Sequence, residues 1–255
     1  MIDLYANIGI GHENDWDVLM SRIIAAAQCN SDAVIITKST PNLIIPESKK
    51  YVSITSKWGN LPYLEVAKKS EIDDLNIRKF NKLTEEIGIP VIWCITDTEA
   101  GDWVKEHTNC SKIKIHYDAK DNKELIDFCI HNFHEIILPG NSEWKDYCIE
   151  FCNNKKKERS RFSFYHTTNK FPSQIEELNL NSLNKFTNLS EFKIGYEGRC
   201  TGIFPDCAVV FKDVDFIEKY LGDEDQEDGA LLSHSDFYNF FLNMNQLEIA
   251  NGKKD

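Results

Sequence analysis

Short apolar runs alternate with amphipathic segments along most of the chain. Continuous β-branched runs, such as residues 33–38 (AVIITK), are typical of strands buried on both faces. The segment from Asp15 to Cys29 instead repeats its apolar residues at helical spacing. We predict eight strands, at residues 4–10, 33–38, 91–96, 112–117, 135–138, 161–166, 192–196 and 215–220. Helices are predicted at residues 15–29, 75–87, 98–106, 123–133, 142–153, 182–186 and 205–211, with a last helix beginning near Ser235.

Eight strands that alternate with helices predict a parallel sheet, and a chain of 255 residues can close that sheet into a (β/α)₈ TIM barrel. We expect one barrel domain over residues 1–250 and a short polar tail at 251–255. An open doubly wound sheet is the alternative, although no G-x-G-x-x-G follows the first strand. Residues 39–72 contain three prolines and a glycine and are predicted to be irregular.

The charge balance limits the class of partner. The formal net charge is -12, so neither a nucleic acid nor an anionic membrane is expected to bind. No signal peptide and no stretch long enough to cross a bilayer is recognisable, which predicts a cytoplasmic protein. The eight cysteines form no C-x-x-C pair and are interpreted as reduced thiols.

A polar cluster follows the sixth predicted strand. It consists of His166, Thr167, Thr168 and Asn169, and it ends at Phe171-Pro172. In α/β proteins, ligands usually lie at the C-terminal ends of strands, so this cluster is a candidate site. The alternative is a solvated loop with one buried histidine.

This cluster resembles a motif of the sialic acid synthase family, H-T-T-N-x-[FY]-P followed by N-L. Other segments resemble the same family in the same order. Residues 6–12 (ANIGIGH) are similar to A-E-I-G-x-N-H, residues 31–37 (SDAVIIT) to A-D-A-V-K-F-Q, and residues 217–220 (IEKY) to I-E-K-H. Lys114 matches the lysine of F-K-I-x-S. The resemblance covers nearly the whole chain, except that the family's small C-terminal antifreeze-like domain is expected to be absent.

The resemblance implies a TIM barrel that condenses phosphoenolpyruvate with the open-chain aldehyde of an N-acyl sugar. In that reaction a divalent metal held by two histidines polarises the aldehyde. The two histidine positions are Arg199 and Tyr220 here, and the phosphate-binding lysine and the glutamate of the first strand are Ile35 and Asn7. Arginine cannot serve as such a ligand, so we predict that the metal site is lost and that no cofactor is bound.

The candidate site residues follow from the motif and from the chemistry of the side chains. Lys114 and His166 are the candidate catalytic residues. The candidate ligand-binding residues, for a small anionic or sugar ligand, are His12, Lys114, His116, Thr167, Thr168, Asn169 and Arg199. For Lys114 and Arg199 the alternative is a solvent-exposed cation, and for His12 it is a hydrogen bond to a neighbouring strand end.

Two functions of different classes remain open. One is a divergent enzyme of cytoplasmic carbohydrate biosynthesis, for which the family's carbon–carbon bond formation is doubtful. The other is a non-catalytic barrel that serves as a ligand-binding or regulatory protein, with a second copy or another protein as partner. The fold alone cannot decide between them.

Overall fold

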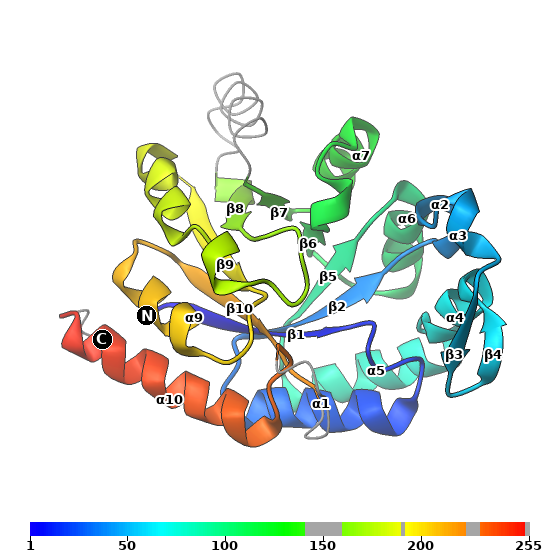
Figure 1. Ribbon diagram of the computed structural model, residues 1–255, viewed down its shortest axis with the longest axis horizontal. Helices are drawn as coiled ribbons and strands as arrows, with labels where there is room; N and C mark the ends of the chain where they lie inside the picture. The colour runs from blue at the N-terminus through cyan, green and yellow to red at the C-terminus, as the bar shows by residue number, and fades with distance from the viewer. Residues whose placement is uncertain (141–159, 190–191, 223–229, 253–255) are drawn as a thin grey trace.

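A closed barrel of eight parallel strands forms the centre of the molecule (Figure 1). The computed structural model describes residues 1–140, 160–189, 192–222 and 230–252. The strands are β1 (Asp3–Gly9), β2 (Ala33–Lys38), β5 (Val91–Ile95), β6 (Lys112–Ile115), β7 (Glu135–Pro139), β8 (Phe162–His166), β9 (Lys193–Gly198) and β10 (Phe216–Tyr220). They follow one another around the barrel in the order β1-β10-β9-β8-β7-β6-β5-β2. The TIM-barrel prediction is therefore confirmed.

Helices and short 3₁₀ turns connect the strands. The helices outside residues 39–72 are α1 (Trp16–Gln28), α5 (Asp74–Ile87), α6 (Thr98–His107), α7 (Lys123–Asn132), α9 (Phe204–Ala208) and α10 (His234–Ala250). The 3₁₀ helices are η1 (Tyr117–Ala119), η3 (Ile175–Glu177), η4 (Leu180–Leu189) and η5 (Val209–Phe211). The helix predicted at 142–153 lies outside the described residues. In the described part of the chain, no helix has the length and apolar character that a membrane span requires.

Local sequence explains where two of these helices begin and end. The Asp15 carboxylate accepts hydrogen bonds from the backbone N–H groups of Asp17 and Val18, which caps the first turn of α1. Gly88 ends α5 with φ 77°, a left-handed conformation that glycine adopts without steric cost.

Residues 39–72 form a small excursion beside the barrel, seen at the right of Figure 1. It contains α2 (Pro41–Ile44), α3 (Glu47–Lys50), the antiparallel hairpin of β3 (Ser53–Ser56) and β4 (Gly59–Pro62), and α4 (Tyr63–Ser70). The prediction of an irregular segment here is wrong. Most of these elements are too short to give a clear apolar period in the sequence. Their regular structure depends instead on packing against one another.

The barrel wall separates two cores, because successive side chains of a strand point to opposite faces. Ile113 and Ile115 of β6 belong to the outer core, which packs against the helices. The inner core fills the barrel with Tyr5, Ala33, Ile35, Ile92, Cys94, Ile137, Tyr165 and Phe216. Lys114 lies between Ile113 and Ile115 and therefore points into the barrel.

Candidate functional site

Lys114 is buried at the centre of the barrel, with a relative exposure of 1%. Its Nζ donates to both carboxylate oxygens of Glu218, at 2.8 and 2.6 Å, and to Oε2 of Glu197 at 3.1 Å. The ammonium also lies 4.3 Å from the ring centroid of Tyr165, a favourable cation–π distance. The three N–H groups of the ammonium thus have acceptors within the protein, and the alternative of a solvent-exposed lysine is excluded.

The Glu197 carboxylate connects Lys114 to two further residues. Its Oε1 accepts from Arg199 Nε at 2.7 Å and from the Tyr220 hydroxyl at 2.6 Å. Arg199 also donates through Nη1 to the carbonyl of Thr168 at 3.3 Å, and it is buried rather than on the surface. Charge-assisted bonds of this length are strong, so the carboxylate is held from several sides.

The strand register explains why the lysine is needed. Glu197 and Glu218 are register partners on the adjacent strands β9 and β10, so two buried carboxylates stand side by side on the inner face. Like charges that stand directly opposite each other on neighbouring strands repel, and each carboxylate is costly to bury without a partner. Lys114 reaches them from β6, which lies across the barrel from β10 in the strand order, and it compensates both charges.

The pKa shifts follow from burial and from these ion pairs. Burial alone raises the pKa of the Glu197 carboxyl, but the charges of Lys114 and Arg199 outweigh it and hold this pKa well below its usual range. Burial lowers the pKa of Lys114, and the two glutamates outweigh this effect and raise it. For Glu218, burial and the charge of Glu197 dominate and raise the pKa, despite the opposing effect of Lys114.

Sequence reasoning missed Glu197 and Glu218 as site residues. The sequence does contain a signal for them. Glu197 stands two positions before Arg199, and Glu218 stands two positions before Tyr220. Residues two apart on a strand point to the same face, so both glutamates share a face with a motif position. Asn7 also belongs to the network, since its Nδ2 donates to Glu218 Oε1. Its Oδ1 is buried, and no hydrogen-bond partner is found for it among the described residues.

The divalent metal that the resemblance implies does not fit these residues. The Arg199 guanidinium has no lone pair to donate and places a positive charge at a position where the resemblance implies a metal ligand. The Tyr220 hydroxyl donates its hydrogen to Glu197. Burial and the Glu197 charge raise the Tyr220 pKa well above its ordinary value, so a metal-binding phenolate is disfavoured. In the described residues, no three His, Cys, Asp or Glu side chains cluster as metal ligands do.

The polar cluster after β8 does not come together with Lys114 as a unit. His166 lies on the same side of β8 as Phe162 and Phe164 of the outer core, with Nε2 2.8 Å from the Leu178 carbonyl oxygen. The hydroxyl of Thr167 donates to the Glu197 backbone carbonyl at 3.4 Å. The catalytic role of His166 stays a prediction, which the position of its side chain does not favour.

Thr168 and Asn169 lie further along this loop. The Thr168 hydroxyl bonds to Ser173 at the next turn, while its carbonyl accepts from Arg199. Asn169 is exposed. This loop therefore reaches the central network through the Thr168 carbonyl, which contacts Arg199, and through the Thr167 hydroxyl, which contacts the Glu197 backbone.

Two histidines on other strand ends have lowered pKa values, which favours their neutral forms. His12 is buried, and burial together with nearby Arg22 lowers its pKa to about 4. Burial likewise lowers the pKa of His116. The Nδ1 of His116 accepts from the backbone N–H of Asp118 at 3.2 Å, so in the neutral ring Nε2 carries the hydrogen.

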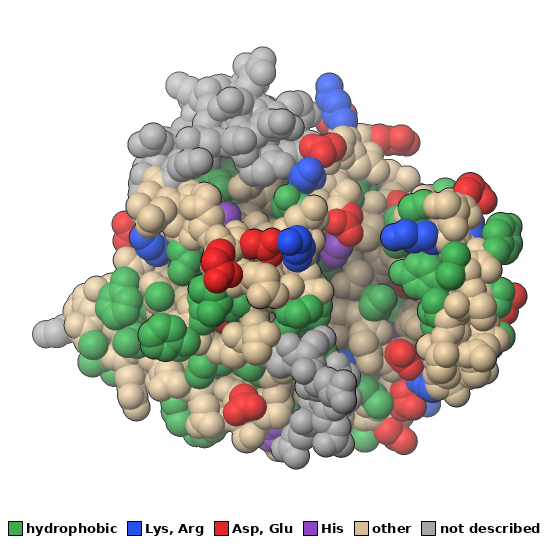
Figure 2. Space-filling model, viewed as in Figure 1, with side chains coloured by type: hydrophobic (Ala, Val, Ile, Leu, Met, Phe, Trp, Pro, Cys, Tyr) green, Lys and Arg blue, Asp and Glu red, His purple; other side chains and the backbone are tan. Residues whose placement is uncertain are grey.

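A cavity of about 430 Å³ lies at the mouth of the barrel beside His116. It is formed by the C-terminal ends of β2, β5 and β6 and by the excursion of residues 39–72, and Figure 2 shows the surface hollowed next to this excursion. Its lining residues are Ile10, Thr37, Ser39, Ile44, Ile45, Pro46, Lys49, Tyr63, Thr96, His116, Asp118, Ala119 and Asn122. TIM-barrel ligands bind at this end of the strands.

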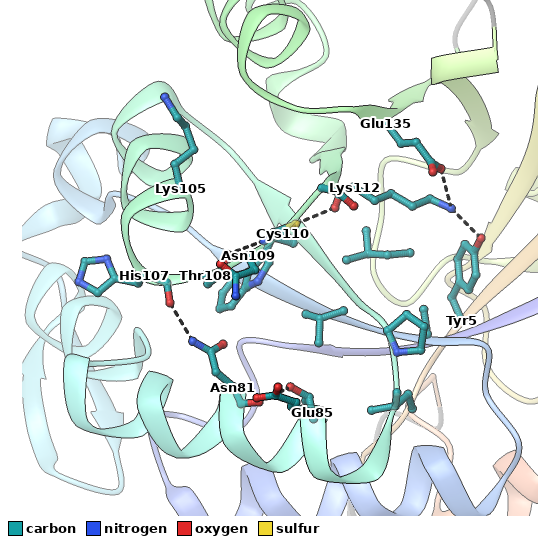
Figure 3. Close-up of a pocket in the computed structure, with 18 of the residues that line it drawn as sticks. Tyr5, Asn81, Glu85, Lys105, His107, Thr108, Asn109, Cys110, Lys112 and Glu135 are labelled. Carbon is teal, nitrogen blue, oxygen red and sulfur yellow. Dashed lines mark hydrogen bonds and ion pairs between the residues drawn. The ribbon is translucent and has the colours of Figure 1, made fainter.

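A larger cavity, about 900 Å³, lies at the opposite end of the barrel (Figure 3). There the Lys112 ammonium lies 3.1 Å from the Tyr5 hydroxyl and 3.6 Å from Glu135, and Asn81 donates to the His107 carbonyl at 2.8 Å. These groups satisfy one another across the N-terminal ends of the strands. Because barrel chemistry is found at the other end, the smaller mouth cavity is the better candidate ligand site.

Comparisons with known proteins agree with this architecture. The sequence matches the NeuB family over residues 22–255. It is 24% identical over 221 residues to the human N-acetylneuraminate-9-phosphate synthase, and this match covers 86% of the chain. The matched region amounts to 61% of the human protein's own length, so the chain spans less than two thirds of that relative.

Two solved structures share the fold. The N-acetylneuraminic acid synthetase of Leptospira borgpetersenii superposes with a TM-score of 0.84 at 16% identity, covering 100% of this chain and 86% of that one. A spore coat polysaccharide biosynthesis protein of Bacillus subtilis gives a TM-score of 0.76 at 17% identity, covering 100% of this chain and 70% of that one. Since the family match extends over most of the sequence, this chain belongs to the NeuB family.

Proposed function

We propose that this protein is a ligand-binding barrel of carbohydrate biosynthesis that does not carry out the metal-dependent condensation of phosphoenolpyruvate with an N-acyl sugar. The names of its relatives, which are synthases of sialic acids and a protein of polysaccharide biosynthesis, support the carbohydrate setting. The proposed ligand is an oxygen-rich molecule of the size of a sugar, bound in the mouth cavity.

One observation carries the proposal. The Glu197 carboxylate bonds to Lys114, Arg199 and Tyr220 at the centre of the barrel, where the reaction would need a metal and free positive charge. Phosphoenolpyruvate carries several negative charges, and a binding site must supply cations to oppose them. Here both central cations are already paired with carboxylates, so the loss of transition-state stabilisation would cost orders of magnitude in rate.

The chemistry of the mouth cavity supports a sugar-like ligand. Lining side chains that can donate hydrogen bonds include His116, Thr37 and Tyr63, while Ile45 and Pro46 provide an apolar wall. Ligand sites commonly combine a few polar groups with apolar lining, and about 430 Å³ is within their usual size range. The apolar wall suits the ring face or acyl group of a sugar, and the donors suit its oxygens.

The first test measures the condensation directly. Purified protein is incubated with phosphoenolpyruvate, N-acetylmannosamine and Mn²⁺, and phosphate release is followed. We expect no release above the protein-free rate. Sugar-dependent release at an enzymatic rate would refute the proposal.

The second test measures binding by calorimetry with N-acetylated hexosamines. We expect a saturable heat of binding for the native protein. The affinity should fall at least tenfold in His116→Ala, because this side chain can donate a hydrogen bond at the cavity. His131→Ala is the matched control, since His131 is exposed on α7 and does not line the cavity. If the two variants behave alike, the cavity is not the binding site, and a protein partner becomes the better explanation.

A further inference from the structure

The central network contains an arrangement of donors that a protein would use to bind a free carboxylate. Lys114 approaches one oxygen of Glu197, at 3.1 Å, and Arg199 Nε and the Tyr220 hydroxyl approach the other, at 2.7 and 2.6 Å. These donors come from β6, from the residue after β9 and from β10. Two cations and a hydroxyl that converge in a dry environment are an effective anion site.

The charges of the network balance only because Glu197 is part of it. Lys114 and Arg199 contribute two positive charges, and Glu197 and Glu218 contribute two negative ones, so the sum is zero. Without the Glu197 carboxylate the sum becomes one positive charge. A buried charge that lacks its partner is costly, so the vacated position would favour an anion from solution.

The donors are held in place by contacts other than Glu197. Lys114 keeps both oxygens of Glu218, and Glu218 keeps the Asn7 amide. Arg199 keeps the carbonyl of Thr168 through Nη1. Removal of the Glu197 side chain would therefore leave a vacated volume lined by donors that remain oriented.

We infer that Glu197 is an internal ligand, which means that the barrel centre is a carboxylate-binding site occupied by the protein's own side chain. In the native chain this site is closed to anions from solution. When the Glu197 side chain is shortened, the site accepts a small free carboxylate such as acetate. The inference does not depend on which ligand the mouth cavity binds.

The experiment is chemical rescue of thermal stability. Glu197→Ala is melted in sodium acetate and in sodium chloride at equal ionic strength. Without a carboxylate we expect its melting temperature to fall on the order of 10 °C below the native protein, because a buried ion pair is broken. Acetate should restore at least half of that loss in a saturable manner, while the native protein should respond equally to the two salts.

Two controls separate a carboxylate site from a general effect of acetate. Ile137→Ala removes an uncharged side chain from the same inner core, so its lost stability should not respond to acetate. Glu197→Gln removes the charge but fills the volume, so acetate should not rescue it either. Rescue of either control to the same degree as Glu197→Ala would overturn the inference.

A second variant covers the case in which Glu197→Ala does not fold in chloride. Glu197→Ser leaves a similar volume and a hydroxyl that can hydrogen-bond to a bound carboxylate. Folding of either variant in acetate but not in chloride supports the inference. Equal behaviour in both salts, or failure of both variants to fold in molar acetate, contradicts it. Acetate that binds the native protein as tightly as it binds Glu197→Ala would also contradict it.

Discussion

Glu218 and Lys219 are neighbours on β10, and both are fully buried, yet they serve different parts of the molecule. The Glu218 side chain points into the barrel and joins the four-charge network at its centre. The Lys219 side chain points outward, where its Nζ lies 2.7 Å from the carboxylate of Asp206 on α9 and 2.7 Å from the Cys200 carbonyl oxygen. The alternation of a strand thus places one buried charge in a site and the next in the wall behind it.

The outer ion pair fixes the position of a helix. Asp206 packs so closely against β9 that a Cβ atom on Gly198 would lie 2.3 Å from its Oδ1, so this position requires glycine. Among the described residues, each of the two charges of the outer pair has one ionic partner. The inner network is different, because Glu197 holds two cations and could be exchanged for a free anion. Burial of charge therefore does not by itself identify a site, whereas several donors that converge on one carboxylate do.

The largest expected effect comes from removal of the central lysine. Lys114→Met leaves two adjacent carboxylates buried, with Arg199 as the one cation paired to them among the described residues. It should cost about 5 kcal/mol of unfolding free energy, at the upper end for a broken buried pair. Urea unfolding measures this cost. Lys112→Met is the matched control on the same strand face, and it should cost less than about 1 kcal/mol, because its pair with Glu135 is partly exposed. A loss for Lys114→Met as small as the loss for Lys112→Met would show that the network contributes little to stability.

Breaking the outer pair should cost less unfolding free energy than breaking the inner network, and a second substitution should restore most of it. Lys219→Met should cost about 4 kcal/mol, since Asp206 would remain buried without its partner. The double variant Lys219→Met with Asp206→Leu should recover most of this loss, because two apolar side chains can replace a buried ion pair. Urea unfolding of both variants measures the coupling. A double variant no more stable than the single one would mean that the pair is needed for the position of α9.

A third kind of buried polar group carries no charge and should make stability depend on pH. His12 has a pKa near 6.5 when unfolded and about 4 when folded, so the unfolded chain binds the extra proton between these values. The contribution of neutral His12 to the free energy of unfolding is therefore complete above pH 6.5. It is lost as the pH falls toward 4, by about 3 kcal/mol in total. Comparison of the native protein with His12→Gln over this range isolates the effect. Parallel stability curves would show that His12 does not titrate with unfolding.

The barrel could be predicted because its evidence is local. Each buried strand is a short apolar run, and helical periodicity and caps such as Asp15 and Gly88 mark the segments between. The inward position of Lys114 also follows from local alternation with Ile113 and Ile115. The prediction for residues 39–72 was wrong, because four of the five elements there have only four residues and carry too little periodic signal.

The candidate site could be predicted only in part, because its contacts join distant strands. The bond between Lys114 and Glu218 spans 104 positions of sequence and depends on closure of the barrel. His166 was selected because it is polar and stands at a strand end, but alternation with the inward-facing Tyr165 turns it toward the outer core. Strand parity could have suggested that Lys114, Glu197 and Glu218 all face the barrel interior, but not which of them pair.

The smallest expected effect sharpens the distinction between charge and hydrogen bonding within the inner network. Tyr220→Phe removes the hydroxyl that donates to Glu197 Oε1 but leaves Arg199 Nε on the same oxygen, at 2.7 Å. The loss should therefore be about 1 kcal/mol, the usual value for one hydrogen bond when its acceptor stays satisfied. The network keeps its charge balance, so Tyr220→Phe should gain no response to acetate, unlike Glu197→Ala. A loss as large as that of Lys114→Met would mean that the hydroxyl, rather than the ion pairs, organises the centre of the barrel.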